Sequence, residues 1–236
     1  MIAKPEAVEF FFRPGLTWPR RTSGLGIRAF PRGGIFSDKG PTMFVASDDE
    51  NTLLALCALV NSRAFLSLAA IHLARVTLAQ SFEVGIIQST PLPNINRVDT
   101  EDLLGLATAS FNLRRDLDTV NELSHVFWLP ALLRSKVMTV GASIANWSEI
   151  TYCATESLRR NQAEIDDLAF GLYGILDEDR RELEASSETT SNSENDVDDE
   201  VEEQDEVAGN IDPAKLVDEL VSYAVGCAFG RWDIRI

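Results

Sequence analysis

The chain has 236 residues, of which 45% are hydrophobic and 25% are charged, a composition that allows an ordinary globular core. Its 37 acidic and 21 basic side chains give a formal net charge of −16, and one segment carries nearly all of the excess. Residues 177–219 hold 18 acidic and 3 basic side chains, whereas residues 1–45 hold 7 basic and 3 acidic ones. The overall acidity therefore does not exclude a nucleic-acid partner for the basic opening.

Metal and disulfide chemistry find little support in the sequence. The two histidines, His72 and His125, have no Cys, Asp or Glu around them at a metal-ligand spacing, so no metal site is expected. Cys57, Cys153 and Cys227 are odd in number, widely separated and set in apolar surroundings. We interpret them as reduced, buried thiols of a cytoplasmic protein.

A membrane location is not expected. The longest apolar stretch, 53–74, is interrupted in its centre by Asn61, Ser62 and Arg63, which would be costly at the middle of a bilayer. The first residues include Glu6 instead of the apolar run of a signal peptide. The sequence thus predicts a soluble, intracellular protein.

The first half of the chain predicts short strands followed by two helices. Residues 8–45 alternate short aromatic or β-branched runs with Gly and Pro, a pattern typical of a small meander of strands. The runs are Val8–Phe12, Ile27–Phe30, Ile35–Phe36 and Met43–Val45. Acidic capping residues then precede an apolar run, which predicts a helix over 48–60, and a second helix should cover 62–74.

The second half predicts a helical hairpin. After an irregular stretch over 82–93, Asp99 or Thr100 can cap a long helix with an apolar stripe. A second stripe covers 148–173, and Gly174 supplies the residue that ends that helix. Pro130 should interrupt any helix between the two. We expect the two stripes to pack against each other in an antiparallel hairpin or bundle.

From residue 177 the sequence becomes acidic and polar. We expect a disordered linker over about 180–210, because 186–206 contains only two apolar side chains, Val197 and Val201. A short C-terminal helix should begin near Asp212-Pro213 and dock on the core through Gly226 and Gly230.

The expected fold class is α+β. It comprises a small meander of short strands with helices, a helical hairpin or bundle, a disordered acidic linker and a C-terminal helix. The expected domains are 1–98, 99–176, 177–211 and 212–236.

The basic opening carries the candidate DNA-binding residues. An aromatic side chain, guanidinium groups and small hydroxyls lie close together, and such groups can hold phosphates and base edges from loops between strands. These residues are Trp18, Arg20, Arg21, Thr22, Ser23, Arg28, Arg32 and Lys39. An equally weighted alternative is a solvated loop in which Trp18 anchors the core. Gly24, Gly26 and Ala29 match a loose dinucleotide fingerprint, but Pro31 would break the helix that such a site requires.

Several segments together resemble one family. They are Gly15-Leu16-Thr17-Trp18, Thr22-Ser23-Gly24, Gly34 to Gly40, Leu53 to Ser62, Phe82 to Ile87 with Pro91-Leu92-Pro93, Glu164 to Leu168 with Leu172-Tyr173-Gly174, and Tyr223 to Arg231, which reads YAVGCAFGR. The chain resembles the carboxy-terminal half of large adenine-specific DNA methyltransferases of phage-defence systems, the BREX-type enzymes and related fused restriction-modification methyltransferases. The resemblance extends over about 8–232.

The resemblance implies target-recognition and helical parts that hold duplex DNA while an adenine is flipped and methylated from S-adenosylmethionine. The family's catalytic tetrapeptide, Asn or Asp followed by Pro-Pro-Tyr or Pro-Pro-Phe, is absent, and no Pro-Pro occurs. We therefore expect an inactive fragment or split subunit whose end at 231–236 looks cut short. No cofactor is expected in this chain. S-adenosylmethionine would belong to a catalytic methyltransferase domain or subunit, the second partner beside double-stranded DNA.

A different class of function is also open. The chain can instead be a non-catalytic interaction or regulatory subunit whose acidic segment 177–211 occupies a basic groove. Salt-dependent binding of duplex DNA distinguishes the two readings, because only the first requires it.

Overall fold

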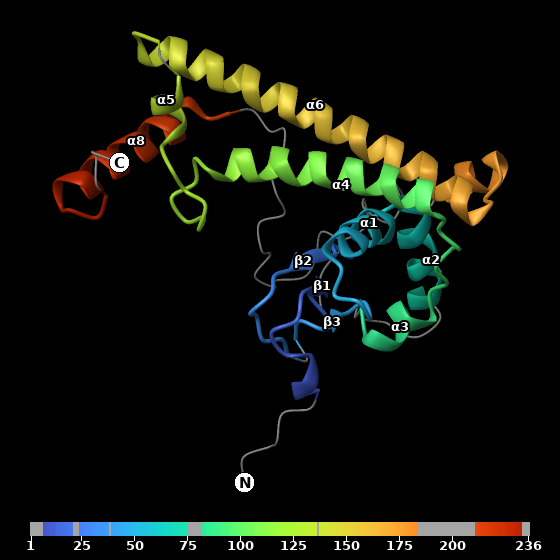
Figure 1. The fold of residues 1–236 in the computed structure, drawn as a ribbon. Helices are drawn as coiled ribbons and strands as arrows, with labels where there is room; N and C mark the ends of the chain where they lie inside the picture. The colour runs from blue at the N-terminus through green and yellow to red at the C-terminus, as the bar shows by residue number, and fades with distance from the viewer. Residues whose placement is uncertain are drawn as a thin grey trace. The chain divides into compact units, whose positions relative to one another are not determined.

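A computed structural model describes residues 7–20, 24–37, 39–74, 82–135, 137–183 and 211–232, with the side chains of 73 and 74 excepted. The chain divides into two compact units (Figure 1). Unit 1 comprises Met1–Thr108 and Asn161–Asp198, and unit 2 comprises Ala109–Arg160 and Asp199–Ile236. This division differs from the predicted boundaries after 98 and 176, because two long helices each contribute to both units.

Unit 1 contains a three-stranded antiparallel sheet. Its strands are β1 (Gly15–Thr17), β2 (Arg28–Phe30) and β3 (Thr42–Met43). Their order is β2-β1-β3, with Leu16 opposite both Ala29 and Met43. The strands are short, as predicted, and the α+β class is confirmed. The first strand lies in the centre, however, so the strands do not follow one another across the sheet as in a sequential meander.

Two of the predicted strand segments have another structure. Val8–Phe10 forms a short 3₁₀ helix, η1, and Phe12 adopts a positive φ of 68°. Ile35 and Phe36 lie outside the three strands. Bulky aromatic residues carry a high strand propensity, but here the rings pack on one another instead of along a strand. β1 instead uses a Gly-Leu-Thr segment that the sequence pattern did not mark as a strand.

Two helices follow the sheet, as predicted. α1 (Glu50–Val60) begins at Asp49, whose carboxylate accepts a hydrogen bond from the Thr52 amide at 2.8 Å. α2 (Arg63–Ala74) begins after Ser62. A third, α3 (Val84–Ser89), lies in the stretch expected to be irregular, and its six residues are too few to show a helical period. Figure 1 shows α1 next to the sheet.

Two long helices start earlier than predicted. α4 (Arg97–Asp118) is capped by Asn96, whose side-chain oxygen accepts hydrogen bonds from the amides of Val98 at 2.8 Å and Asp99 at 3.1 Å. α6 (Val140–Tyr173) begins eight residues before Ser148. Near its start, the Thr139 hydroxyl accepts from the Ala142 amide at 3.2 Å. Side-chain caps thus lie upstream of the apolar stripes that guided the prediction.

Gly174 ends α6, as the sequence predicts. Its φ is +65°, the Gly174 amide donates to the Gly171 carbonyl, and the Ile175 amide donates to the Phe170 carbonyl, both at 3.1 Å. This pair of bonds is a Schellman motif. Ile175 and Phe170 also share an apolar cluster, which is the hydrophobic contact that often accompanies the motif.

The core of unit 1 has two parts. In one, Leu16, Trp18 and Ile27 pack against the apolar side of α1 and α2. In the other, residues of α1 and α2 pack between Leu103 of α4 and Ile165 of α6. Leu103 of α4 and Ile165 of α6 thus belong to one apolar cluster, whereas the direct antiparallel pairing of the two stripes stays a prediction.

Ordered structure continues beyond residue 176. Residues 177–183 are helical, Leu183 packs against the α4–α6 cluster, and Arg180 pairs with Asp167 at 2.7 Å. The expectation that the linker begins at 177 is therefore wrong for these seven residues, because Leu183 and Arg180 both find partners in unit 1. The remainder of the predicted linker, 184–210, lies outside the described residues.

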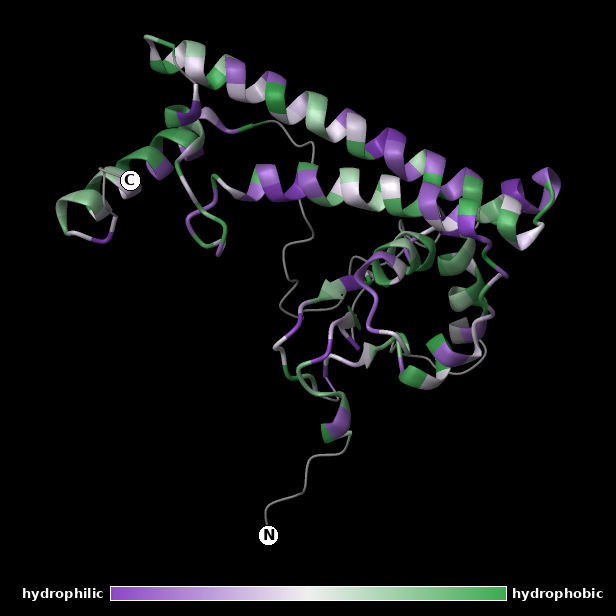
Figure 2. Ribbon diagram, viewed as in Figure 1, coloured by the Kyte–Doolittle hydropathy of each residue, from purple (hydrophilic) through white to green (hydrophobic). Residues whose placement is uncertain are grey.

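Unit 2 has a small core. α5 (Ala131–Arg134) follows Pro130, as expected of a helix-breaking position, and α8 (Pro213–Ala228) begins at the predicted Asp212, which accepts from the Ala214 amide at 2.9 Å. The buried residues of this core are Ala131, Leu132, Trp147 and Leu216, with Leu117 of α4 and Ile144 of α6 against them. Figure 2 shows α1 and α8 as largely hydrophobic.

The end of α8 corrects a second expectation. A Cβ at Gly226 would stand 2.7 Å from Cδ1 of Trp232, and Gly230, with a φ of +76°, turns the chain back. Trp232 packs against Phe127, with ring centroids 4.9 Å apart. The prediction that α8 docks through Gly226 and Gly230 is wrong, because the two glycines accommodate the returning chain while Leu216 and its neighbours contact the core.

The burial of the cysteines differs from the prediction. Cys153 is exposed and Cys57 and Cys227 are half-buried, so the expectation that all three are buried is wrong.

Within the described ranges no single helix is long and apolar enough to cross a membrane. α1 and most of α2 reach the required length only together, and the chain bends by 67° between them. The described residues also contain no cluster of three metal-ligating side chains.

Candidate nucleic-acid interface

The segments that carry the family resemblance contact one another in unit 1. The Trp18 indole donates a hydrogen bond to the Phe82 carbonyl at 2.9 Å, and the Phe82 amide donates to the Arg20 carbonyl at 2.8 Å. Two segments more than sixty residues apart are thereby joined beside the sheet. Both partners of the first bond are buried, so the bond is shielded from water.

A second connection joins the loop before β2 to the end of α1. The Asn61 side chain accepts from the Ile27 amide at 2.9 Å and donates to the Ile27 carbonyl at 2.7 Å. It also donates to the Cys57 carbonyl at 2.8 Å. One amide side chain therefore satisfies three backbone groups and fixes the chain where it enters β2.

A third connection holds the start of α2. The Asp166 carboxylate of α6 accepts from the Arg63 amide at 2.8 Å and from Gln162 at 3.0 Å. Burial raises the pKa of Asp166, and these hydrogen bonds together with the Arg63 charge oppose that rise. The Tyr173 hydroxyl of the same helix donates to the Pro91 carbonyl at 2.9 Å. We name the residues of these connections, Trp18, Asn61, Asp166 and Tyr173, the motif scaffold.

Trp18, one of the predicted DNA-binding residues, belongs to this scaffold. Only 3% of Trp18 is exposed, and its one polar hydrogen is already used by Phe82. The expectation of an aromatic side chain facing DNA at this position is wrong, and the alternative of a core anchor is correct for Trp18. Arg21, Thr22 and Ser23 lie outside the described residues.

Arg20 and Lys39 lie next to each other at the end of the sheet. The Trp18 amide donates to the Pro41 carbonyl at 3.4 Å and the Arg20 amide to the Lys39 carbonyl at 3.2 Å, which continues the pairing of β1 with β3. The Arg20 guanidinium also pairs with Glu83 at 2.7 Å on the surface. Lys39 is exposed.

Arg28 lies on the solvent side of the sheet. It stands directly opposite Thr17, which in turn stands opposite Thr42, and side chains directly opposite in a sheet share a face. This face is the reverse of the one on which Leu16 and Trp18 are buried. Arg28 is exposed, so its guanidinium can reach a ligand laid across the sheet.

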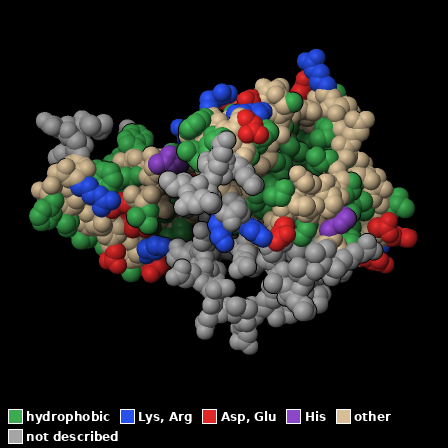
Figure 3. Space-filling model, turned by 90° about the horizontal axis from the view of Figure 1, so that it is seen from below, with side chains coloured by type: hydrophobic (Ala, Val, Ile, Leu, Met, Phe, Trp, Pro, Cys, Tyr) green, Lys and Arg blue, Asp and Glu red, His purple; other side chains and the backbone are tan. Residues whose placement is uncertain are grey.

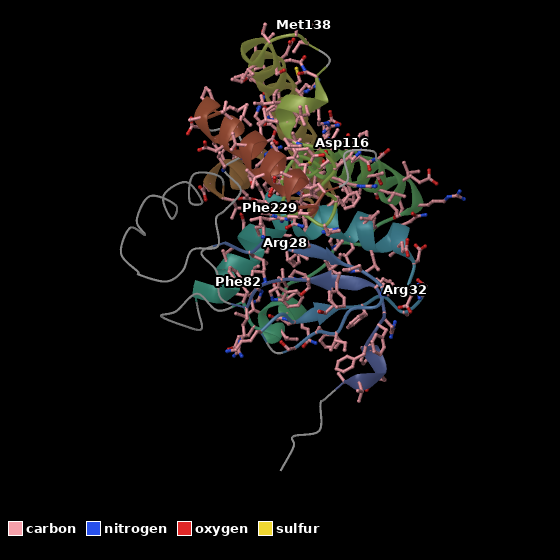
Figure 4. The ribbon with its side chains drawn as sticks, turned by 90° about the vertical axis from the view of Figure 1, so that its left-hand side faces the viewer. Arg28, Arg32, Phe82, Asp116, Met138 and Phe229 are labelled. Carbon is pink, nitrogen blue, oxygen red and sulfur yellow. The ribbon has the colours of Figure 1, made fainter. Side chains whose placement is uncertain are left out.

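Arg32 is separated from the other cations. It follows β2 in the turn that pairs with residue 12, whereas Arg28 begins β2, and Figure 4 shows the two at opposite ends of the strand. The structure thus brings Arg20, Arg28 and Lys39 to one end of the sheet and leaves Arg32 at the other. Figure 3 accordingly shows Lys and Arg side chains spread over the face seen from below instead of in one patch.

An aromatic cluster near Arg32 was not predicted. The Arg13 guanidinium lies 5.2 Å from the Phe10 ring centroid and 5.4 Å from that of Phe44, and it pairs with Asp48 at 2.6 Å. Phe11 and Phe36 extend the cluster. The signal in the sequence was the run Phe10-Phe11-Phe12-Arg13, which we interpreted as part of a strand.

This arrangement can hold a polyanion. Arg28, Arg32 and Lys39 are exposed and form no ion pair with any residue that the structure describes. They are mounted on a sheet whose backbone is fixed by buried hydrogen bonds. Such cations can neutralise phosphates, and Arg can also bind a guanine edge through two hydrogen bonds.

Comparisons with known proteins agree with the resemblance seen in the sequence. No protein-family model matches the chain. It is 25% identical over 232 residues to the adenine-specific methyltransferase PglX of Lacticaseibacillus casei (strain Zhang), a match that covers 96% of this chain and 17% of the relative. It is 24% identical over 229 residues to the adenine-specific methyltransferase BrxX of Escherichia coli O9:H4 (strain HS), covering 96% and 18%. The chain thus spans less than a fifth of the length of these curated relatives, and it is a segment related to adenine-specific methyltransferases.

Proposed function

We propose that the chain recognises duplex DNA for adenine-N6 methylation in a phage-defence or restriction-modification system, and that a separate catalytic methyltransferase domain or subunit performs the methyl transfer. The observation that carries the proposal is the grouping of the exposed cations Arg28 and Lys39 with the half-buried Arg20 at one end of the sheet in a chain related to adenine-specific methyltransferases. Arg21, Thr22 and Ser23 directly follow Arg20 in the sequence and stay predicted DNA-binding residues.

The division of labour between scaffold and surface supports this function. Recognition requires side chains held in a fixed register on the duplex, because phosphate contacts position a protein and base contacts specify the site. The motif scaffold fixes the backbone next to β1 and β2 through a buried hydrogen bond at Trp18 and half-buried hydrogen bonds at Asn61. Arg28 and Lys39, unlike the motif scaffold, are exposed, so they can contact the phosphates and base edges of a duplex.

Gly24 and Gly26 do not form a cofactor loop of the dinucleotide type. A cofactor loop of the dinucleotide type needs glycines between a buried strand and a helix N-terminus. Here Gly24 and Gly26 lead into β2 instead of a helix. We therefore place the cofactor on the catalytic partner. The catalytic partner has to bring the target adenine, extruded from the helix, to the methyl donor.

Fluorescence anisotropy with a labelled mixed-sequence duplex tests the proposal over a series of salt concentrations. Arg28→Ala combined with Lys39→Ala should weaken binding and lower the slope of log K against log salt by about 2, if each side chain contacts one phosphate. Arg97→Ala is the matched control. That side chain is exposed on α4 and pairs only with the neighbouring turn through Glu101 at 2.9 Å. Its removal should leave the slope unchanged.

A variant that is expected to strengthen DNA binding complements this test. Glu83→Gln removes the carboxylate that pairs with Arg20 at the surface, so it should strengthen binding modestly. Weakening by Arg97→Ala of about half that of the double variant would indicate a response to net charge alone and contradict the assigned face. Absence of duplex binding at any salt would reject the function and favour the regulatory reading, in which the acidic segment occupies a basic groove.

The catalytic part of the proposal has its own test. Purified chain incubated with S-adenosylmethionine and mixed-sequence DNA should transfer no methyl groups, because the sequence has no tetrapeptide to hold the target amine. Adenine methylation above a blank without protein would show that the chain needs no catalytic partner.

A further inference from the structure

The end of the sheet opposite the cationic group presents an exposed aromatic side chain. Phe12 is 58% exposed. Ile35, which follows the backbone partner of Phe12, Gly34, is 63% exposed. Most large apolar side chains of unit 1 are covered by the sheet and by α1 and α2, as Leu16 and Phe65 are. Phe12 and Ile35 instead remain exposed where residue 12 pairs with the turn at Gly33 and Gly34, and we call these two side chains the apolar tip.

The backbone under this tip is held firmly. The Phe12 amide donates to the Gly34 carbonyl at 2.9 Å, and the Gly33 amide donates to the Phe12 carbonyl at 3.0 Å. The next residue, Arg13, is fixed by Asp48, by the Val45 carbonyl at 2.9 Å and by two aromatic rings. The ring of Phe12 is therefore exposed from a rigid mount.

The backbone conformation at Phe12 is unusual for this residue type. Its φ of +68° lies in the left-handed region, where a Cβ is crowded and where glycine is favoured. A bulky residue in this region is unfavourable, and the Phe12 ring, which meets the Phe11 ring edge-on with centroids 6.3 Å apart, is still 58% exposed, so burial offsets little of the cost. Such outliers are concentrated at functional positions. The strained backbone at Phe12 therefore favours a functional role for its side chain.

We propose that Phe12, supported by Ile35, is a wedge that inserts between stacked base pairs of the bound duplex, while Arg32 holds the adjoining phosphate. This inference rests on the proposed function. Apolar side chains used in this way by DNA-binding proteins include Phe and Ile, and they unstack a base step from a fixed backbone. Arg32 immediately precedes Gly33, the residue bonded to Phe12, so a cation and an apolar tip occur together.

The charge around the tip favours DNA over a protein surface as its occupant. Arg32 stands at the same end of β2 as the tip, and Arg28 stands at the other end of that strand. A duplex laid along the exposed face of β2 would meet Arg28, then the tip with Arg32. A wedge that opens a base step also prepares the duplex for extrusion of a neighbouring base, the event that adenine methylation requires.

The test compares the affinity for a fully paired duplex with the affinity for the same duplex carrying one mismatch. A mismatch lowers the cost of unstacking in advance, so the wild-type chain should bind the mismatched duplex at least about tenfold more tightly. Phe12→Gly should bring this ratio near one while the slope of log K against log salt stays unchanged. The folded state should be retained in thermal unfolding, because glycine suits the backbone at this position. Phe12→Trp keeps an aromatic ring and should keep the preference.

Ala7→Gly is the matched control. Ala7 also has a positive φ, 59°, so this change relieves the same kind of backbone crowding without removing a ring, and it should leave the ratio unchanged. An equal ratio in the wild type and in Phe12→Gly, or a wild-type ratio near one, would overturn the wedge. If salt-dependent duplex binding persisted in that case, the proposed function would stand without it. Loss of all duplex binding in the wild type would overturn both.

Discussion

Asp166 of α6 accepts a hydrogen bond at 2.8 Å from the backbone amide of Arg63, which lies 103 positions earlier at the start of α2. The first amides of a helix have no partner within the helix, so a carboxylate supplied by another helix completes the start of α2. The residue is only 3% exposed, which makes the bond difficult to replace by water. Two segments that resemble the same family are therefore mutually dependent.

Asp166→Ala should lower the free energy of unfolding by about 2–3 kcal/mol, because it leaves the Arg63 amide and Gln162 without their acceptor. The neighbouring Asp167→Ala is the control. Its carboxylate is exposed and pairs with Arg180, so the expected loss is under about 1 kcal/mol. Chemical denaturation of the two variants measures the difference. Equal losses would contradict the role assigned to Asp166.

Stability should also depend on pH through Asp166. Burial raises its pKa above the ordinary 3.8 in the folded state, so the folded chain holds the proton more tightly than the unfolded chain. The contribution of this residue is therefore most favourable below 3.8 and is lost as the pH rises through 3.8 toward the raised pKa. Asp166→Asn should remove this dependence, and the difference between the two unfolding curves across pH checks it. A difference of the opposite sign would show that the hydrogen bonds outweigh burial.

Trp18→Phe should separate a core role from a DNA-binding role. Loss of the indole donor leaves the buried Phe82 carbonyl without a partner, at a cost of about 1–2 kcal/mol. The salt dependence of DNA binding should not change, since Trp18 is covered. Unfolding and anisotropy measurements on one preparation test both statements. A lower salt slope with unchanged stability would restore Trp18 to the interface.

Alanine substitution of Gly171, within α6, and of Gly174, directly after it, should change the free energy of unfolding in opposite directions. Gly174→Ala places a Cβ at a φ of +65° and should destabilise the protein by about 1 kcal/mol. Gly171→Ala, one turn earlier, adds a side chain in open space within the helix and should stabilise it by up to about 1 kcal/mol. Thermal unfolding of the pair checks the assignment. Destabilisation by both would mean that residue 171 has a contact role.

Local signals predicted the parts of the fold that depend on single residues. Asp49 and Asp212 each begin a helix because a carboxylate can accept a backbone amide within three residues, and that requirement is visible in the sequence. Gly174 ends a helix for an equally local reason. α1 and α8 were predicted with the correct type and nearly the correct start, and the end of α6 was predicted correctly.

Tertiary contacts decided the parts that the sequence did not predict. β1 is a strand of three residues because β2 and β3 pair with it on both sides. A segment of three residues is too short for a sequence pattern to predict such a strand. Trp18 looked available for DNA because it stands among arginines, yet its burial depends on Phe82, more than sixty residues away. Likewise the candidate cations could be named from the sequence, but their separation into two groups follows from strand register.

The separation between the motif scaffold and the exposed cations has a consequence for how such a protein can change its target. Trp18, Asn61 and Asp166 are committed to buried or half-buried hydrogen bonds, so substitution there should destabilise the fold. Arg28, Arg32 and Lys39 are exposed and can be exchanged at small cost in stability. Under the proposed function, surface substitutions on this framework would change the DNA sequence that is recognised without a change of fold.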